Sequence, residues 1–381
     1  CETLRRNEDQ SIGFYLAKAM PTVSAMLQHL IDHKWNDSKM FMILCGSSMS
    51  FMEHQILGQE SPLYGRRTGQ FKIEPMDYRE TATFHPALSD TDNALIYGIT
   101  GGVPHYINKL DVRDTIDDAL LENFFDRSAY LYEEPANLLK QELREPAIYN
   151  AIIRSIAEGA SRSNEIVTKI GEDSSIVTKY LKTLTDMGIV KRETPITEKP
   201  GRKTIYLLAD NFFRFWYAFG FANFSQLEDG DVNGVYEFAV EPELHKFASF
   251  AFEDVCREFV REMQKKNELP FSYAKMGRWA GKTTVRDDSA ASGLRIAETE
   301  IDLLCIDKDA KEYLVGECKF KKTPFSYSEY LDTLAKLAPQ KEYAKFHYAL
   351  FSESGFDEKI IAEAEKNNTL LYPLAYIVNY K

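Results

Sequence analysis

The sequence predicts a multidomain α/β protein. Its 381 residues exceed one ordinary domain and suit roughly two to four. Hydrophobic residues make up 44% of the chain and aromatic residues 13%, which is enough for several packed cores. Strand-like and helix-like segments alternate near both ends, and a compact run of helices followed by a hairpin lies between them.

The first region, residues 1–80, has the pattern of a parallel α/β sheet. Apolar residues at helical spacing predict a helix over residues 21–35. The short apolar run at 40–45 predicts a fully buried strand, and it ends in the polar tip Gly46-Ser47-Ser48. A further strand is expected at 70–74. Strand, polar tip, helix and strand in this order are typical of a parallel sheet.

The second region, residues 81–143, is expected to be mostly helical. The string Gly101-Gly102-Val103-Pro104 should break it, because glycine and proline end regular helices.

The third region, residues 144–208, predicts the clearest small domain. Ser161 or Ser163 is expected to cap its second helix. Three helices and a β-hairpin in this order predict a winged helix-turn-helix. The expected elements are a helix over 147–158, a second helix that follows Ser161 or Ser163 and ends near 170–171, a third helix over 174–188, and strands over 189–194 and 203–208.

This third region is also the basic part of an acidic chain. Residues 146–208 contain ten Lys/Arg and seven Asp/Glu, a net charge of +3. The whole chain has a net charge of −12, so the remaining residues carry −15. In helix-turn-helix proteins the second helix of the motif enters the major groove. DNA contact through this module is therefore expected, although such modules also serve as protein-contact or lid-extension units. The candidate DNA-binding residues are Lys179, Lys182, Lys191, Arg192, Arg202 and Lys203.

Residues 209–235 form a strongly aromatic linker, which predicts an element that packs between domains. The last region, residues 236–381, begins with a helix predicted over 243–264, and Glu253 lies beside the apolar stripe of this helix.

An acidic hairpin follows in the same region. The turn at 307–311 joins two apolar segments, and a symmetric turn pairs residues whose numbers sum to 619. Asp302 then faces Glu317 and Glu300 faces Lys319. Period-2 alternation puts these four side chains on one face of the hairpin.

Two opposed carboxylates repel each other unless a positive group lies between them. A Mg²⁺ ion held by Asp302 and Glu317 meets this need, because Mg²⁺ prefers carboxylate oxygens and retains water ligands. Such a cation polarises a phosphodiester and activates water. Lys319 is then a candidate for orienting that water, and Glu253 a candidate for a further ligand or a supporting contact. The alternative is a surface hairpin with an ordinary ion pair between Glu300 and Lys319.

Asp302, a hairpin and then Glu317-Cys318-Lys319 resemble the motif of the PD-(D/E)xK nuclease superfamily. A helix before the hairpin, and a helix and strand after it, match the order of that fold. The resemblance implies a restriction-endonuclease-like α/β domain with Glu253, Asp302, Glu317 and Lys319 as catalytic residues. The acid pair would bind the metal, although some superfamily members have lost activity.

Three further strings are similar to the archaeal-type ATPase family within the AAA+/STAND-like NTPases. This resemblance implies a partial parallel NTPase sheet over 1–80, a helical lid over 81–143, a winged helix and a nuclease-like C-terminal domain. It also implies that Ser47 and Ser48 lie near a nucleotide phosphate with Arg66 or Arg67, whereas a helix N-cap is the structural alternative for the serines. The strings are Leu44-Cys45-Gly46-Ser47-Ser48-Met49-Ser50-Phe51-Met52-Glu53, Ser61-Pro62-Leu63-Tyr64-Gly65-Arg66-Arg67-Thr68 and Gly101-Gly102-Val103-Pro104.

The sequence departs from that family at its phosphate-binding motifs. It has no G-x-x-x-x-G-K-[ST] loop, and Ser11-Ile12-Gly13-Phe14 stands where the family carries an acidic Walker B pair. ATP binding and hydrolysis are therefore expected only where the missing motifs lie upstream. The chain is either an incompletely represented family member or one that has lost its ATPase.

The expected environment is a reducing, cytoplasmic one. Five widely spread cysteines favour free thiols over a disulfide framework or a zinc site. No signal-peptide pattern opens the sequence, and no apolar run approaches the roughly 18 residues that span a bilayer. A homo-oligomer is compatible with the sequence.

Overall fold

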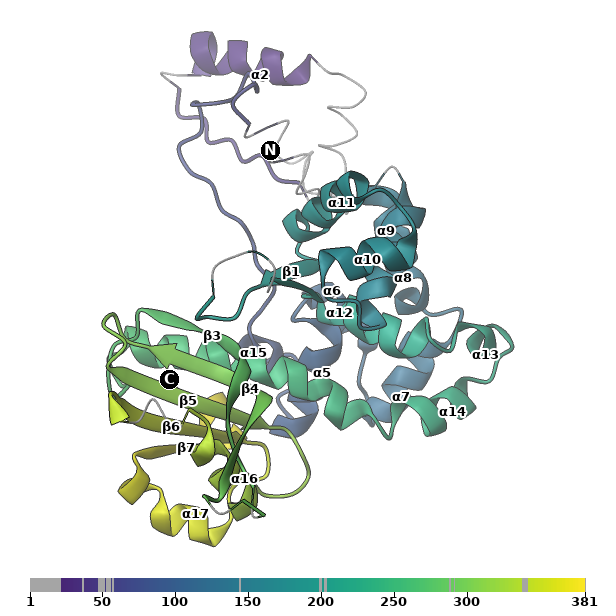
Figure 1. Cartoon of the computed structure of the whole chain (residues 1–381). Helices are drawn as coiled ribbons and strands as arrows, with labels where there is room; N and C mark the ends of the chain where they lie inside the picture. The colour runs from purple at the N-terminus through teal and green to yellow at the C-terminus, as the bar shows by residue number, and fades with distance from the viewer. Residues whose placement is uncertain are drawn as a thin grey trace.

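The computed structural model describes residues 22–35, 38–46, 52, 56, 58–143, 145–198, 201, 204–287, 289, 290, 292–337 and 342–380. These residues form a mixed α/β structure in which a helical half adjoins a five-stranded mixed sheet (Figure 1). No helix among them combines the length and the apolarity that crossing a membrane requires.

The N-terminal region contains the expected helix but lacks the expected strands. Helix α2 (Val23–Leu30) continues into the π-helical turn η1 (Ile31–Trp35), and Figure 1 shows α2 at the end of the molecule away from the sheet. The predicted buried strand at 40–45 is wrong, because these residues form no strand and Phe41 is 83% exposed. The predicted strand at 70–74 is wrong in the same way, with Phe71 90% exposed. A strand needs a hydrogen-bonded neighbour, and no described residue pairs with either segment.

Residues 78–142 are helical, as expected. Gly101 ends α5 in the left-handed conformation at φ 64°, and Pro104 opens α6. The Gly-Gly-Val-Pro string is therefore a helix stop followed at once by a helix start. The elements are α4 (Tyr78–Ala82), α5 (Asp90–Thr100), α6 (Pro104–Leu110), α7 (Ile116–Leu120), η3 (Leu121–Phe125) and α8 (Tyr130–Glu142).

The three helices and the hairpin predicted for 144–208 are present. The antiparallel register runs from Val190 opposite Leu208 to Glu193 opposite Ile205. The expected serine cap is wrong, because α10 begins after Arg162 and the Glu165 carboxylate accepts the N–H groups at its start. The elements are α9 (Pro146–Ala157), α10 (Ser163–Ile170), α11 (Ser174–Asp186), β1 (Val190–Glu193) and β2 (Ile205–Leu208).

The aromatic linker packs between the two halves. The Phe212 ring stacks on Tyr106 of α6 at 4.2 Å between centroids, and Phe215 meets Phe247 of the next long helix at 5.3 Å. One continuous cluster of buried side chains runs through the linker from the helices to the sheet. The linker elements are α12 (Asn211–Phe215), η4 (Trp216–Gly220), α13 (Phe224–Glu228), α14 (Val232–Val235) and η5 (Tyr236–Val240).

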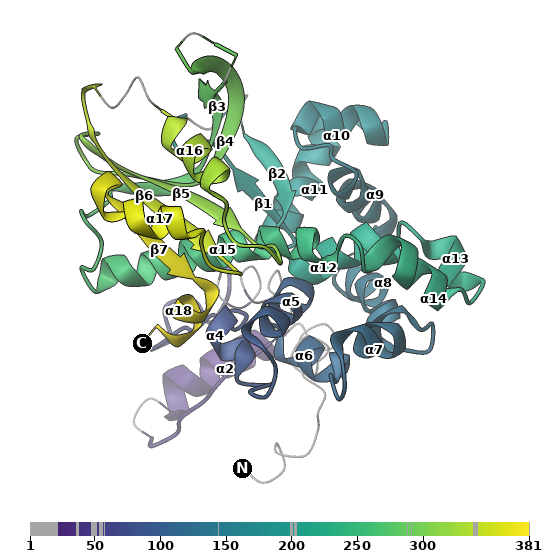
Figure 2. The same ribbon diagram turned by 90° about the horizontal axis from the view of Figure 1, so that it is seen from below.

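The C-terminal sheet has the strand order β3-β4-β5-β6-β7, antiparallel from β3 to β5 and parallel from β5 to β7. Helix α15 packs on one face through Phe252 and Phe259, and α16 and α17 pack on the other through Tyr330 and Ile360 (Figure 2). The elements are α15 (Leu244–Lys265), β3 (Lys275–Arg286), β4 (Leu294–Ile306), β5 (Glu312–Lys319), α16 (Tyr327–Ala335), β6 (Lys345–Ser352), α17 (Glu358–Glu363), η7 (Glu365–Asn367), β7 (Thr369–Pro373) and α18 (Leu374–Asn379).

The segment that follows β1 lies against this sheet. The Ile196 N–H donates to the Arg278 carbonyl of β3 at 3.2 Å, and the Trp279 indole N–H donates to the Thr197 hydroxyl at 3.1 Å. The Lys191 ammonium lies 3.4 Å from the Asp254 carboxylate of α15. The predicted β-hairpin and the segment after it are thus in contact with the C-terminal domain.

Candidate functional site

The predicted hairpin register is confirmed over residues 303–306 and 313–316, and this ladder ends one pair short of Asp302 and Glu317. Leu303 opposes Gly316 and Ile306 opposes Tyr313, so the numbers of paired residues sum to 619 as expected. The backbone N–H of Cys318 donates to the Asp302 carboxylate at 2.9 Å, so Asp302 bends over the end of β5. Asp302 and Glu317 therefore lie near each other on adjacent strands, and the charge of Glu317 acts on the Asp302 carboxyl group.

A β-bulge directs Asp302. On the β3 side of β4, Gly277 opposes Leu304 and Trp279 opposes Ile301, so β4 carries one extra residue there. Bulges re-aim side chains and recur beside active sites. Arg257 of α15 holds the bulged strand, because its guanidinium donates to the Asp302 carbonyl at 2.8 Å.

The bulge also overturns the expected pairing of Glu300 with Lys319. Glu300 forms an ion pair with Arg278 of β3, whereas the Lys319 ammonium lies 2.8 Å from Glu317. One extra residue reverses which face the following side chains take, so period-2 alternation fails at this point.

Glu317 is held by two lysines, one of which the sequence analysis missed. Its carboxylate oxygens lie 2.8 Å from the Lys319 ammonium and 2.5 Å from that of Lys336, and the Glu317 and Lys336 side chains are each 11% exposed. Lys336 caps the C-terminal end of α16, where the Leu337 N–H donates to the Thr283 hydroxyl of β3. Nothing in the spacing of Lys336 from Glu317 indicates this contact, because α16 must first fold back over the sheet.

The three carboxyl groups of the site differ in their electrostatics. Burial by itself would raise the pKa of Glu317, but the charges of Lys336 and Lys319 outweigh it and hold that pKa below its usual value. Burial, and then the charge of Glu317, raise the pKa of Asp302. Burial, and then the charge of Asp302, raise the pKa of Glu253 to about 7. Perturbed carboxyl groups that share a cleft are typical of functional sites.

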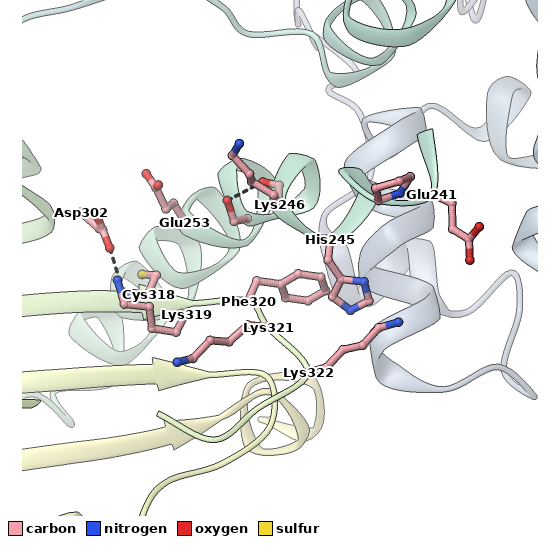
Figure 3. Close-up of a pocket in the computed structure, with 12 residues that line it drawn as sticks. Glu241, His245, Lys246, Glu253, Asp302, Cys318, Lys319, Phe320, Lys321 and Lys322 are labelled. Carbon is pink, nitrogen blue, oxygen red and sulfur yellow. Dashed lines mark hydrogen bonds between the residues drawn. The ribbon is translucent and has the colours of Figure 1, made fainter. Parts of the chain in front are cut away.

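These residues border a cavity of about 870 Å³ between α15 and the end of β5 (Figure 3). Glu253, Asp302 and Lys319 line it, whereas Glu317 is buried and is not among the lining residues. The remaining lining residues are Glu241, Pro242, His245, Lys246, Ser249, Cys318, Phe320, Lys321 and Lys322.

The raised pKa of Glu253 predicts a pH-dependent cost to stability. A carboxyl group whose pKa rises on folding costs nothing while it is protonated in both states, and its cost grows as the pH rises from the unfolded pKa toward about 7. We expect Glu253→Gln to stabilise the protein relative to wild type by about 2 kcal/mol at pH 8 and by much less at pH 5. Urea denaturation at both pH values measures the difference.

Glu262→Gln on the same helix is the matched control. The ion pair with Lys265 lowers the pKa of Glu262, so its replacement should give no gain in stability at pH 8. An equal gain for both variants would mean that the environment of Glu253 is not the cause.

The carboxylate oxygens at the site suit a hard cation that takes only one or two of its ligands from the protein. One Asp302 oxygen accepts from the backbone, which leaves its other oxygen for a ligand. Among the described residues no group of three or more His, Cys, Asp and Glu side chains is arranged to hold a metal. Mg²⁺ commonly uses only one or two carboxylates and completes its shell with water and substrate phosphate. Asp302 and Glu317 fit that mode, provided that a lysine yields one oxygen of Glu317.

The candidate nucleotide-binding residues do not form a site among the described residues. Arg66 forms a two-bond ion pair with Asp32 of η1, at 2.7 and 2.8 Å, and Arg67 is exposed. Ser47 and Ser48 lie outside the described residues.

The candidate DNA-binding residues divide into two groups. Lys179 and Lys182 are exposed on α11, on the side opposite the buried residues of that helix. Arg192 is exposed beside the Tyr206 ring, and Lys191 is paired with Asp254. Arg202 and Lys203 lie outside the described residues.

Two family models match this chain. Residues 10–110 match an ATPase domain predominantly from Archaea, and residues 216–331 match a domain of archaeal and bacterial proteins of unknown function. The two matches in this order confirm the resemblance to the archaeal-type ATPase family. The second match covers α15, the hairpin, Asp302, Glu317 and Lys319.

A similar curated protein is the uncharacterized protein MJECL04 of Methanocaldococcus jannaschii. It is 33% identical over 307 residues, which cover 80% of this chain and 65% of that protein. The chain thus spans somewhat less than two thirds of the relative's length.

Two solved structures show a weak likeness. Protein VC1899 from Vibrio cholerae has a TM-score of 0.24 and 12% identity, over 83% of this chain and 63% of that one. The SdaI restriction endonuclease has a TM-score of 0.20 and 12% identity, over 68% of this chain and 95% of that one.

Proposed function

This chain carries both matched segments of the archaeal-type ATPase family, and from that premise we propose that it acts on DNA through metal-dependent phosphodiester cleavage in its C-terminal domain. The proposal rests on one observation: Asp302, Glu317 and Lys319 meet at the end of one β-hairpin, beside a cavity of about 870 Å³. This arrangement resembles the acid pair and lysine of the PD-(D/E)xK motif and supports the proposal.

Each residue has a role in the proposed reaction. Asp302 and Glu317 would hold a Mg²⁺ ion, which supplies charge stabilisation at the phosphate and a more acidic bound water. Lys319 lines the cavity and would neutralise charge on the phosphate oxygens. Glu253 has a pKa of about 7, so it can accept a proton near neutral pH.

Lys336 extends this arrangement. When a cation draws Glu317 away from one lysine, the other lysine still balances the buried carboxylate. The two lysines would thereby keep Asp302 and Glu317 together before the metal arrives.

The three-helix and hairpin module would act as a winged helix that docks on duplex DNA through α11. Exposed Lys179 and Lys182 suit phosphate contacts, which position a protein without reading bases. We expect Lys182→Glu to weaken duplex binding several-fold at low salt and to reduce the slope of log affinity against log salt by about 1. Fluorescence anisotropy across a salt series measures both quantities.

Lys169→Glu supplies the control, since Lys169 belongs to the same module but already pairs with Glu158 at 2.7 Å. Equal weakening by the two variants would assign the effect to net charge, and no duplex binding by the wild type at low salt would leave the module as an interaction domain.

ATP binding is part of this proposal only as an expectation for the archaeal-type ATPase family as a whole. ATP binding would require a phosphate loop, and residues 1–381 contain no such motif. In a family member that carries such a loop, the ATPase segment would couple nucleotide state to the helices over residues 78–142, which share one core with the C-terminal domain.

The second candidate function is a non-catalytic regulator or a DNA- or protein-binding switch. It is favoured by the two lysines on Glu317, which already satisfy both carboxylate oxygens without a metal. A nuclease-like fold that has lost activity could retain such an internally neutral cluster.

Calorimetry and a cleavage assay together separate the two candidates. Titration of the whole chain with Mn²⁺ should show one bound ion, and incubation with DNA and Mg²⁺ or Mn²⁺ should release fragments that EDTA abolishes. If Mn²⁺ does not bind and plasmid, linear and single-stranded DNA all stay intact, the nuclease is rejected and the regulator is favoured.

A further inference from the structure

The wall of the cavity is more basic than the rest of the protein. Its lining contains four lysines and three acidic residues, an excess of +1, whereas the whole chain carries −12. Figure 3 shows Asp302, Glu253 and Lys319 at one end and Lys322 and Glu241 at the other, with His245 and Phe320 between them. The lysines attract an anion into the cavity, and Lys319 offers a positive charge beside Asp302.

Two of these lysines are exposed enough to bind a phosphate in place of their present contacts. The Lys246 side chain is 79% exposed and its ammonium lies 3.0 Å from Glu243, an exposed ion pair that contributes at most about 1 kcal/mol. Lys322 is exposed on the segment after β5. Lys321 has its ammonium 2.7 Å from Glu329, so it is less available.

The middle of the cavity is an ordered aromatic wall. The His245 ring stacks on the buried Phe320 ring at 5.3 Å between centroids. The ring nitrogen Nε2 of His245 lies 3.2 Å from Glu353, which also accepts from the Thr91 hydroxyl of α5 at 2.9 Å. Phe320 therefore covers one face of the imidazole and Glu353 holds its Nε2, and a flat ring held in this way suits a stacking base on its other face.

The size of the cavity favours one strand over two as its occupant. A sphere of 870 Å³ is about 12 Å across, which is about the width of the major groove alone in B-form DNA. A phosphodiester that reaches Asp302 and Lys319 inside this space can belong to one strand, whereas a complete duplex is too wide to follow it in.

We propose that the cavity binds an unpaired nucleic-acid strand, with phosphates on Lys322 and Lys246, a base against His245, and the backbone leading to Asp302 and Lys319. This inference names the class of substrate for the proposed function. It rests on that function for the cleavage at Asp302 and Lys319. Strand binding itself requires no metal. It can therefore be measured when no cleavage occurs.

The test is fluorescence anisotropy of the whole chain in EDTA, with a labelled single strand of about 15 nucleotides and a duplex of the same sequence. The variant Lys246→Glu/Lys322→Glu should bind the single strand about tenfold more weakly at low salt, and its salt slope should fall by about 1.4 for two lost phosphate contacts. The same variant should leave duplex binding within about twofold of wild type, because duplex would dock on α11.

Lys308→Glu/Lys366→Glu is the matched control. Both lysines are exposed and neither lines the cavity, while the change in net charge is the same. The milder pair Lys246→Ala/Lys322→Ala, with a thermal melt, guards against a folding defect in the first variant and should still weaken single-strand binding.

Equal weakening by the cavity and control pairs, or an equal loss of duplex and single-strand affinity in the cavity variant, would overturn the inference. The outcomes also separate it from the proposed function. Strand binding that depends on these lysines, without cleavage in Mg²⁺ or Mn²⁺, would support the inference and reject the nuclease. Cleavage in Mg²⁺ or Mn²⁺, together with strand binding that does not depend on these lysines, would support the nuclease and reject the inference.

Discussion

Asp302→Asn should lower metal-dependent cleavage by about 10³-fold, because it removes the one carboxylate that both lines the cavity and faces Glu317. The asparagine keeps the size of the side chain and can still accept the Cys318 N–H, so the hairpin should stay folded. Loss of the charge that holds a catalytic cation removes about 4 kcal/mol of transition-state stabilisation, and each 1.36 kcal/mol is tenfold in rate. Single-turnover cleavage rates at saturating Mg²⁺ measure the effect.

Asp309→Asn is the control for this substitution, since Asp309 is an exposed residue of the turn in the same hairpin. Its cleavage rate should match that of wild type. Calorimetry adds a readout that does not depend on turnover, because Asp302→Asn should also abolish the binding of Mn²⁺. A fully active Asp302→Asn protein would exclude this residue from the chemistry.

Gly102→Ala should destabilise the protein by about 4 kcal/mol. Gly102 has φ 73°, and a Cβ there would lie 2.0 Å from the Met76 carbonyl oxygen, a backbone atom that cannot rotate away. The left-handed conformation alone costs alanine about 1–2 kcal/mol, and overpacking adds about 1–3 kcal/mol. The Met76 N–H also donates to the Gly102 carbonyl at 2.9 Å, so any relief of the clash strains this bond. Urea denaturation gives the change in the free energy of unfolding.

Gly171→Ala separates the two causes. Gly171 also follows a helix with φ 78°, but a Cβ there meets nothing within 4 Å. Its cost should therefore stay at about 1–2 kcal/mol, the strain of the left-handed backbone by itself. Similar losses at both glycines would mean that the contact with Met76 relaxes freely.

Much of the C-terminal site was accessible from the sequence. The turn at 307–311 and the apolar segments beside it fixed the register that pairs residues 303–306 with residues 313–316, because a short hairpin allows few registers and each slip would turn the apolar side chains outward. The helices of the small basic module were predictable for a similar reason. Glycines such as Gly171 and Gly188 close those helices with positive φ, and the apolar stripe of α11 is buried as its spacing indicates.

The two wrong strand predictions have a common cause, because a strand forms only beside a neighbouring strand. The segments at 40–45 and 70–74 have the composition of buried strands, yet among the described residues nothing pairs with them, and Phe41 and Phe71 are exposed. Apolarity and length indicate that a segment would suit a sheet. They do not supply the adjacent strand whose hydrogen bonds make it one.

Local pattern therefore predicted the helices of the basic module, the long helix before the hairpin and the hairpin register itself, since contacts within one turn or one hairpin depend on residues close in sequence. Tertiary structure decided the rest of the site. The bulge opposite Arg278 moved Glu300 away from Lys319, and the fold of α16 over the sheet brought Lys336 to Glu317. Those contacts join elements that are distant along the chain, and their geometry exists only after the sheet and its covering helices have packed.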